Sequence, residues 1–235
     1  MTTYAGIDLH SSNCYLAVID EQQRRLFSKR LPNSLDHIQA ALQPFKEQLS
    51  GVVVESTYNW YWLVDGLQDM GYRMHLANPS AIRQYEGLKH TDDPWDAFWL
   101  AQLLMLGILP QGYIYPKAER PTRDLLRRRL LFVRHRTAHI LSLQSMVARC
   151  CGRRISVNEI KKMTPQEAAA LFSDPQLGLT ARFQVETIGF LSQQIRSIEK
   201  AVLPQVKLHP EFVILLTIPG IGKILALTIM LEVGD

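Results

Sequence analysis

The sequence predicts an α/β fold, in which a mixed β-sheet with helices is followed by a long helical region. Three apolar, β-leaning runs at 4–8, 14–19 and 25–31 are separated only by short polar turns, which is typical of an antiparallel meander. Beyond them, segments with helical periodicity alternate with short strands, and this alternation favours a mixed sheet covered by helices. Residues 122–151 contain neither proline nor glycine, which predicts one helix of about 30 residues.

The other elements of the N-terminal half follow from local signals. The run at 51–55 contains three consecutive valines and is typical of a buried central strand. Ser34 precedes a helical pattern as its N-cap, and Gly71 and Gly107 each follow the end of another. We therefore expect, in order, a helix over 35–49, a strand over 51–55, a helix over 60–70, a strand over 72–76 and a helix over 93–106.

The helical region contains two narrow, mainly apolar stripes, called seams below. In the first long helix, positions recur at alternating spacings of four and three, as in a coiled coil; they are Leu126, Leu130, Val133, Thr137, Ile140, Gln144 and Val147. A second seam predicts a helix over about 180–201; it consists of Ile188, Leu191, Ile195, Ile198 and Val202. We expect these helices to pair, within one chain or between two. The expected domains are the sheet domain at 1–116, a basic helix and coiled-coil linker at 117–207, and the beginning of a further domain at 208–235.

The apolar segment 212–230 is nearly long enough to cross a bilayer, but Pro219-Gly220-Ile221-Gly222-Lys223 lies in its middle. A lysine at the centre of a membrane helix costs roughly 2.5–3.5 kcal/mol, so we expect two short helices around a tight turn and no membrane partner. In helix-hairpin-helix modules, such a turn lets backbone N–H groups approach a phosphate. Gly220, Gly222 and Lys223 are therefore candidate nucleic-acid contacts, and a plain turn between helices is the alternative.

The positive charge is concentrated in one stretch of the chain. Residues 117–154 contain 11 Lys and Arg but only 2 Asp and Glu, whereas the 116 residues before them contain 8 and 12. Such a local excess indicates a site for a polyanion. On a helix, five arginines fall on one arc narrower than half a turn; they are Arg120, Arg123, Arg127, Arg134 and Arg149. We interpret this arc as a nucleic-acid-binding face, and the alternative is the solvated face of a dimerising helix.

Four carboxylates lie where a strand or helix end would present them. Asp8 ends the first strand, Glu55 ends the Val-Val-Val strand, and Asp93 and Asp96 lie three residues apart at the start of a helix. Oxygen ligands gathered in this way suit Mg²⁺, with Mn²⁺ as a substitute, and two such ions promote phosphodiester chemistry. A structural role remains an alternative for Asp8, which could simply end its strand, and for Asp93, which could cap its helix.

Taken together, several motifs resemble the DEDD transposases of bacterial insertion sequences. The motifs are Gly6-Ile7-Asp8-Leu9-His10, Val53-Val54-Glu55-Ser56-Thr57, Asn78-Pro79, Asp93-Pro94-Trp95-Asp96-Ala97 and, at the start of that family's C-terminal domain, Ile218-Pro219-Gly220-Ile221-Gly222. The resemblance covers nearly the whole chain. It implies a ribonuclease-H-like N-terminal domain of the RuvC type, in which Asp8, Glu55, Asp93 and Asp96 form a catalytic, metal-binding tetrad. It also implies a DNA transposase or recombinase that is guided by a structured RNA and works as a homo-dimer or tetramer.

The chain departs from that family at two places. The family often has Lys-Thr-Asp before its last acidic pair, whereas here His90-Thr91-Asp92-Asp93 leaves Asp92 as an alternative to Asp93. The family's nucleophilic serine would lie beyond Asp235, so we expect a truncated chain in which no serine takes that role. The family's location, together with three cysteines that form no disulfide framework and an N-terminus without a signal peptide, predicts a bacterial cytoplasmic, nucleoid-associated protein.

Two other functions compete with a recombining enzyme. A catalytically inactive, dimeric fragment would still bind DNA or RNA through the basic helix. An actin-like or sugar-kinase phosphotransferase shares the early Gly-Ile-Asp, but it needs small phosphate-wrapping residues after the aspartate and a second glycine-rich loop. His10-Ser11-Ser12 is poorly suited to wrap a phosphate, so we favour the transposase interpretation.

Overall fold

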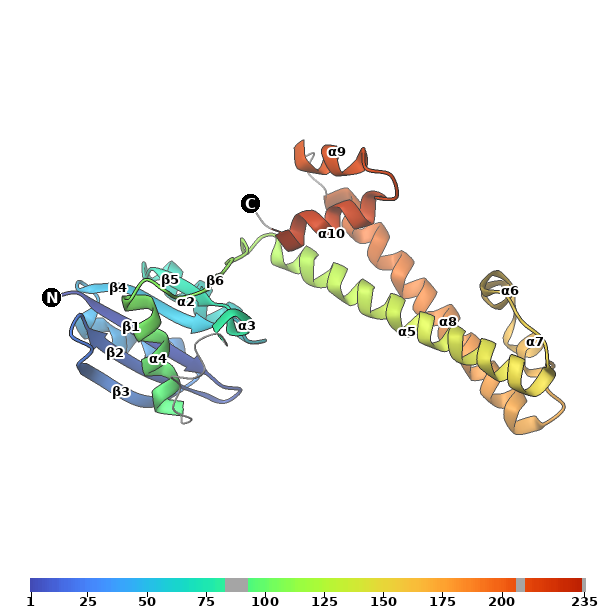
Figure 1. The fold of residues 1–235 in the computed structure, drawn as a ribbon, viewed down its shortest axis with the longest axis horizontal. Helices are drawn as coiled ribbons and strands as arrows, with labels where there is room; N and C mark the ends of the chain where they lie inside the picture. Colours follow the sequence, from blue (N-terminus) through green and yellow to red (C-terminus); the bar gives the residue numbers. More distant parts are fainter. Residues whose placement is uncertain (83–92, 206–209, 234–235) are drawn as a thin grey trace. The chain divides into compact units, whose positions relative to one another are not determined.

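The computed structural model describes residues 1–82, 93–205 and 210–233. The chain forms two compact units, Met1–Ile114 and Tyr115–Asp235 (Figure 1). The boundary lies two residues before the one expected at 116, and the segments expected as separate domains at 117–207 and 208–235 share one unit.

The N-terminal unit contains a six-stranded sheet with the order β3-β2-β1-β4-β5-β6. The strands are β1 (Thr3–Leu9), β2 (Asn13–Asp20), β3 (Arg25–Pro32), β4 (Leu49–Glu55), β5 (Met74–Ala77) and β6 (Gln111–Gly112). β1 pairs with β2 antiparallel and with β4 parallel, and β4 pairs with β5 parallel. Among the first five strands only β2 runs against the others, so the sheet is mixed. The expected α/β fold with a mixed sheet and helices is therefore confirmed.

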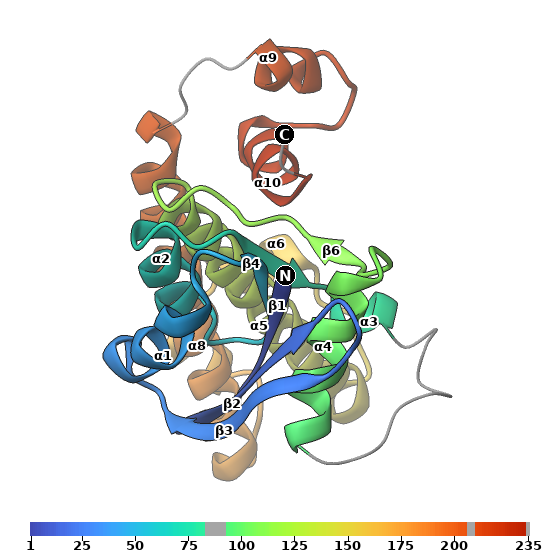
Figure 2. The same cartoon turned by 90° about the vertical axis from the view of Figure 1, so that its left-hand side faces the viewer.

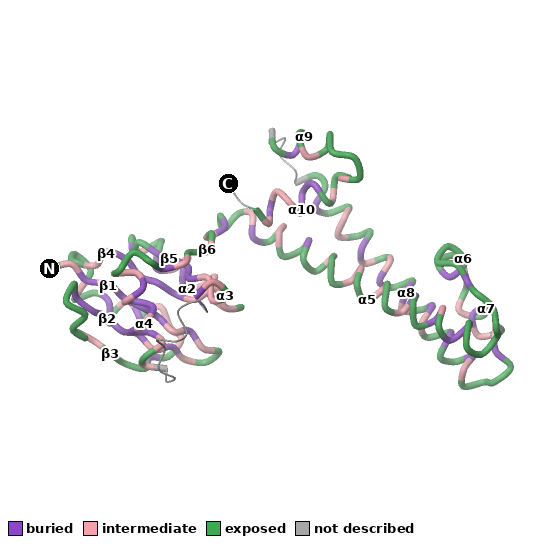
Figure 3. The backbone as a smooth tube through the Cα atoms, viewed as in Figure 1, coloured by how far each residue is buried: buried purple, intermediate pink, exposed green. Residues whose placement is uncertain are grey.

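Helices cover both faces of this sheet (Figure 2). Ala5, Ile7 and Leu9 of β1 belong to a buried cluster with side chains of α1 (Leu35–Leu42) and α2 (Tyr61–Asp69). The alternate residues of β1 face α4 (Asp93–Met105), because successive side chains of a strand point to opposite faces. The purple segments of β1, β2 and β4 in Figure 3 show how fully these strands are buried.

The helix expected over 35–49 is shorter than predicted. It ends at Leu42 and is followed by a 3₁₀ turn, η1 (Gln43–Phe45). Pro44 explains the difference, because proline has no N–H to donate to the carbonyl four residues earlier, so the regular α-helical hydrogen bonding stops there. The short helix α3 (Pro79–Ile82) and the strand β6 were not predicted.

The C-terminal unit is helical in its described part. Its helices are α5 (Arg120–Cys151), α6 (Val157–Lys162), α7 (Pro165–Ala169), α8 (Pro175–Val202), the 3₁₀ turn η3 (Leu203–Gln205), α9 (Pro210–Leu216) and α10 (Lys223–Val233). Ile140, Leu143 and Val147 of α5 pack with Val185 and Ile188 of α8, so the predicted pairing occurs within one chain. In the described residues no helix is long and apolar enough to span a membrane, and the apolar segment 212–230 forms parts of two short helices as expected.

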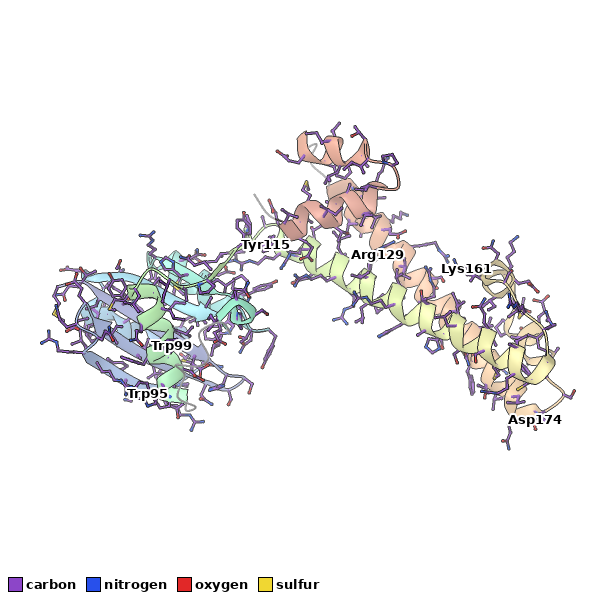
Figure 4. All side chains as sticks on the ribbon, in the orientation of Figure 1. Trp95, Trp99, Tyr115, Arg129, Lys161 and Asp174 are labelled. Atoms are coloured by element: carbon purple, nitrogen blue, oxygen red, sulfur yellow. The ribbon has the colours of Figure 1, made fainter. Side chains whose placement is uncertain are left out.

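The seam of α5 differs from the predicted one in its N-terminal half. Leu130 and Thr137 are exposed, whereas Arg129 and Arg136 are partly buried in their place. Arg129 donates from Nε to Oε1 of Glu199 on α8 at 2.7 Å, so its charge is paired where it faces the neighbouring helix (Figure 4). The prediction failed because a paired arginine buries its aliphatic stem as an apolar residue does.

The α5–α8 core gives a first testable prediction. Leu143 is fully buried and Leu141, two residues earlier, is 59% exposed. We expect Leu143→Ala to lower the free energy of unfolding of the helical unit by about 2–5 kcal/mol, because it leaves a cavity. Leu141→Ala should change it by no more than about 0.5 kcal/mol. Urea unfolding followed by far-ultraviolet circular dichroism measures both, and equal losses would contradict the observed seam.

Candidate functional site

Asp8 and Glu55 lie at the ends of two neighbouring parallel strands. The register pairs Ile7 of β1 with Val54 of β4, and the two carboxylates directly follow this pair. Neighbouring strands are about 4.8 Å apart, so the backbones at these positions are close. The sheet therefore brings together the two acidic residues that the sequence placed at strand ends.

Both carboxylates belong to the face of the sheet that α4 covers. Gly6 packs so tightly on this helix that an added Cβ would lie 2.7 Å from the backbone nitrogen of Ala101 and closer still to the carbonyl oxygen of Ala97. Asp8 follows two residues later and shares that face. On β4, Val53 packs in one cluster with Leu100 of α4, and Glu55 is again two residues on.

The direction of α4 brings its first turns toward the same end of the sheet. Near its C-terminal end, Gln102 Nε2 donates to Oε1 of Gln23 at 2.7 Å, and Gln23 follows β2 at the end where β1 begins. The helix therefore runs against β1, and its N-terminal turns lie toward the strand end that carries Asp8. Asp96 is four residues before Leu100, a rise of about 6 Å, which is close to the roughly 6.6 Å that two strand residues span from Val53 to Glu55.

The structure describes Asp93 by its backbone alone. The backbone of Asp93 begins α4, one turn before Asp96, but its side chain lies outside the described residues, as does all of Asp92. The choice between the two as the third acid thus stays a prediction. For Asp8, Glu55 and Asp96 the structure gives one shared face and one shared end of the sheet.

His10 is a member of this site that the sequence reasoning did not select. Its Nε2 lies 3.2 Å from Oδ2 of Asp8. Its backbone is fixed, because the Nδ2 groups of Asn33 and Asn59 each donate to the His10 carbonyl at 2.9 Å. Its position directly after β1, two residues from Asp8, was a usable signal, because extended backbone places alternate side chains on the same side. The imidazole restricts where the Asp8 carboxylate can point.

Oxygen donors at one end of a sheet fit Mg²⁺. This ion is held by one or two carboxylates and completes its octahedron with water and phosphate oxygens. Within the described residues, no three His, Cys, Asp or Glu side chains form a group that could hold a metal ion by themselves. Asp8, Glu55 and Asp96 are therefore not gathered into such a group, and metal binding at this end of the sheet stays a prediction.

Cys14 reports on this region and gives a second prediction. Burial, and after it the charge of Asp8, raise the pKa of the Cys14 thiol from 9.0 to about 11. At pH 8 only about 0.1% is then thiolate, the reactive form. We expect iodoacetamide to label the exposed Cys150 in the native chain and Cys14 only in urea, as measured by peptide mass spectrometry. Native labelling of both at similar rates would contradict the buried position of β2.

The predicted arginine arc on α5 is only partly available to a ligand. Arg120 is buried, with 4% of its surface exposed, and its Nε donates to the Tyr115 carbonyl at 2.7 Å, so the expectation that it presents its charge outward is wrong. Arg123 and Arg127 both donate to the carboxylate of Glu232 on α10. Long-range partners of this kind cannot be seen in a helical projection. Arg134 and Arg149 are exposed as expected, and a role of the arc in binding stays a prediction.

The glycine turn lies between α9 and α10 as predicted. Gly220 has φ +87°, a conformation that only glycine adopts readily, and an added Cβ at Gly222 would meet nothing within 4 Å. Lys223 is the first residue of α10 and is exposed. The turn thus has the open backbone that phosphate contact requires, and the contact itself remains a prediction.

Comparisons with known proteins bear on this site. A family model described as Transposase, DEDD_Tnp_IS110, matches residues 5–151. A solved structure of T. thermophilus RuvC in complex with Holliday junction substrate is similar with 13% identity and a TM-score of 0.32; the match covers 48% of this chain and 100% of that one. No curated protein matches the chain. Because the family model spans more than half of the sequence and includes β1, β4 and α4, the chain belongs to the DEDD transposases of the IS110 type.

Proposed function

We propose that the chain is an insertion-sequence recombinase whose N-terminal unit carries a divalent-metal site for DNA phosphodiesters. The ligands in this proposal are Asp8, Glu55, Asp93 and Asp96. The observation that supports it best is the parallel pairing of β1 and β4, which ends directly before Asp8 and Glu55 on the face that α4 covers. Membership of a transposase family supports DNA as the substrate.

Each described residue has a separate task in this proposal. Mg²⁺ or Mn²⁺, when bound, supplies charge stabilisation at a phosphodiester oxygen. Asp8 and Glu55 hold the ion at the sheet end, and Asp96 approaches from the helix. His10 orients Asp8 through the contact between Nε2 and Oδ2. The rigid strands keep the two carboxylates at a fixed spacing, which is what positional catalysis needs.

The partners follow from charge. The exposed Arg134 and Arg149 are proposed to contact DNA phosphates, and the glycine turn with Lys223 to add a further contact. A structured guide RNA is proposed as the second polyanion. A homo-dimer or tetramer is proposed as the working form, although α5 and α8 already bury their seams against each other within one chain.

The test is cleavage of a labelled four-way DNA junction by the full chain. We expect nicking in Mg²⁺ or Mn²⁺ and none after chelation with EDTA. Binding of the junction without cleavage in either metal would favour the alternative, an inactive nucleic-acid-binding protein. Absence of both binding and cleavage would contradict the proposed function.

A further inference from the structure

Glu232 on α10 is held by two arginines of α5 in a two-pronged arrangement. Arg127 donates from Nε to Oε1 at 2.6 Å and from its terminal NH2 to Oε2 at 2.7 Å. The terminal NH2 of Arg123 donates to Oε2 at 3.0 Å. Both oxygens of one carboxylate are therefore bound, which is the geometry in which a guanidinium fork recognises a planar oxyanion.

Arg123 has a second contact besides the Glu232 carboxylate. The guanidinium of Arg123 lies over the Tyr115 ring, 3.8 Å from its centroid, and its side chain is only 11% exposed. Tyr115 is itself fixed, because the buried Arg120 donates to its carbonyl and its hydroxyl donates to the backbone carbonyl of Glu232. Arg127 is 51% exposed, so one side of the fork faces solvent. A guanidinium fork with one side open to solvent has the features of a binding site.

A second ion pair in the same unit shows the simpler contact that links two packed helices. Arg129 of α5 contacts Glu199 of α8 through one carboxylate oxygen, Oε1, and one arginine is involved. At Glu232, hydrogen bonding by Arg127 and the charges of both arginines hold the pKa of the carboxyl below its usual range. The Glu232 carboxylate is therefore negatively charged at neutral pH and is bound by two arginine cations.

We propose that Arg123 and Arg127 form an oxyanion site for a phosphate of a nucleic-acid backbone, and that Glu232 fills this site in the free chain. The ligand rests on the proposed function. A phosphodiester offers the fork two oxygens and one negative charge, as the carboxylate does, so the two compete for the same seat. Two arginines of the basic stretch then add little to affinity until Glu232 moves away.

The test measures binding of the full chain to a labelled DNA duplex and to an RNA hairpin of equal length, by fluorescence anisotropy over a salt series. We expect Glu232→Gln to tighten binding about tenfold at low salt and to steepen the log–log salt slope by about one to two units, since each phosphate contact adds roughly 0.9. Glu199→Gln removes the same charge from the Arg129 pair and should change affinity less than about twofold. The nucleic acid that shows the larger gain identifies the source of the phosphate.

Two further variants keep the test decisive if Glu232→Gln unfolds. In the otherwise native chain, Arg127→Gln should flatten the salt slope by clearly less than Arg134→Gln, for which we expect about 0.9, because Glu232 competes with phosphate for Arg127. Equal flattening by both would overturn the proposal. Equal changes in nucleic-acid affinity for Glu232→Gln and Glu199→Gln would also overturn it. In that case the chain still binds nucleic acid, so the proposed function is not contradicted. If the native chain and Glu232→Gln bind neither nucleic acid, both proposals fail.

Discussion

Replacing Gly6 by alanine should lower the free energy of unfolding of the N-terminal unit by about 3 kcal/mol, the upper end of the range for overpacking. The new Cβ would lie 2.7 Å from the Ala101 nitrogen and nearer to the Ala97 carbonyl. These are backbone atoms of α4, so no side-chain rotation relieves the clash and the helix has to move. Because Asp96 directly precedes Ala97, the same movement would shift Asp96 relative to Asp8 and so disturb the proposed metal site.

Tryptophan fluorescence during urea unfolding measures this effect selectively, because all four tryptophans lie in the N-terminal unit at positions 60, 62, 95 and 99. Figure 4 labels two of them, Trp95 and Trp99, on α4 itself. Gly189→Ala is the control, since an added Cβ in α8 meets nothing within 4 Å. It should leave the fluorescence transition unchanged and stabilise the helical unit by up to about 1 kcal/mol. A midpoint for Gly6→Ala equal to that of the native chain would mean that α4 does not pack on β1.

The fold could be predicted wherever local pattern and tertiary packing agree. The three valines at 52–54 indicated the central strand, and Gly107 correctly marked the end of α4. The prediction failed where one residue outweighed the periodicity, as Pro44 did at the end of α1. It also failed in α5, because the sequence does not reveal that Arg129 has Glu199 as a partner 70 residues away.

The candidate site, like the fold, could be predicted only in part. Strand ends predicted where Asp8 and Glu55 lie, but only the register of β1 on β4 shows that they are neighbours. His10 was missed although its spacing from Asp8 was visible. The helical projection placed the arginines on one side of α5, but it could not show which of them are exposed. Glu232 lies 105 residues from Arg127 in the sequence and binds it in the fold.

Asp8→Asn and Glu55→Gln should each weaken Mn²⁺ binding at least about 100-fold, the upper end of the loss caused by removing an outer-shell partner of a metal ligand. Junction cleavage should fall about 1,000-fold, equivalent to roughly 4 kcal/mol of transition-state stabilisation. Both changes keep the size of the side chain and remove one ionic oxygen. Isothermal titration with Mn²⁺ measures the first effect without requiring activity.

Two exposed carboxylates of the same unit provide matched controls. Asp36 lies on α1 and Glu47 precedes β4, so Asp36→Asn and Glu47→Gln remove the same charge away from the proposed site. We expect both to bind Mn²⁺ within about twofold of the native chain, because exposed charges that far away are screened. Stability separates a metal site from a structural role. Without metal, neighbouring carboxylates repel each other, so Asp8→Asn should not lower the urea midpoint of the tryptophan signal. A clear loss of stability with unchanged Mn²⁺ affinity would show that Asp8 serves the fold rather than a metal ion, and the acidic end of the sheet would then have to be explained without one.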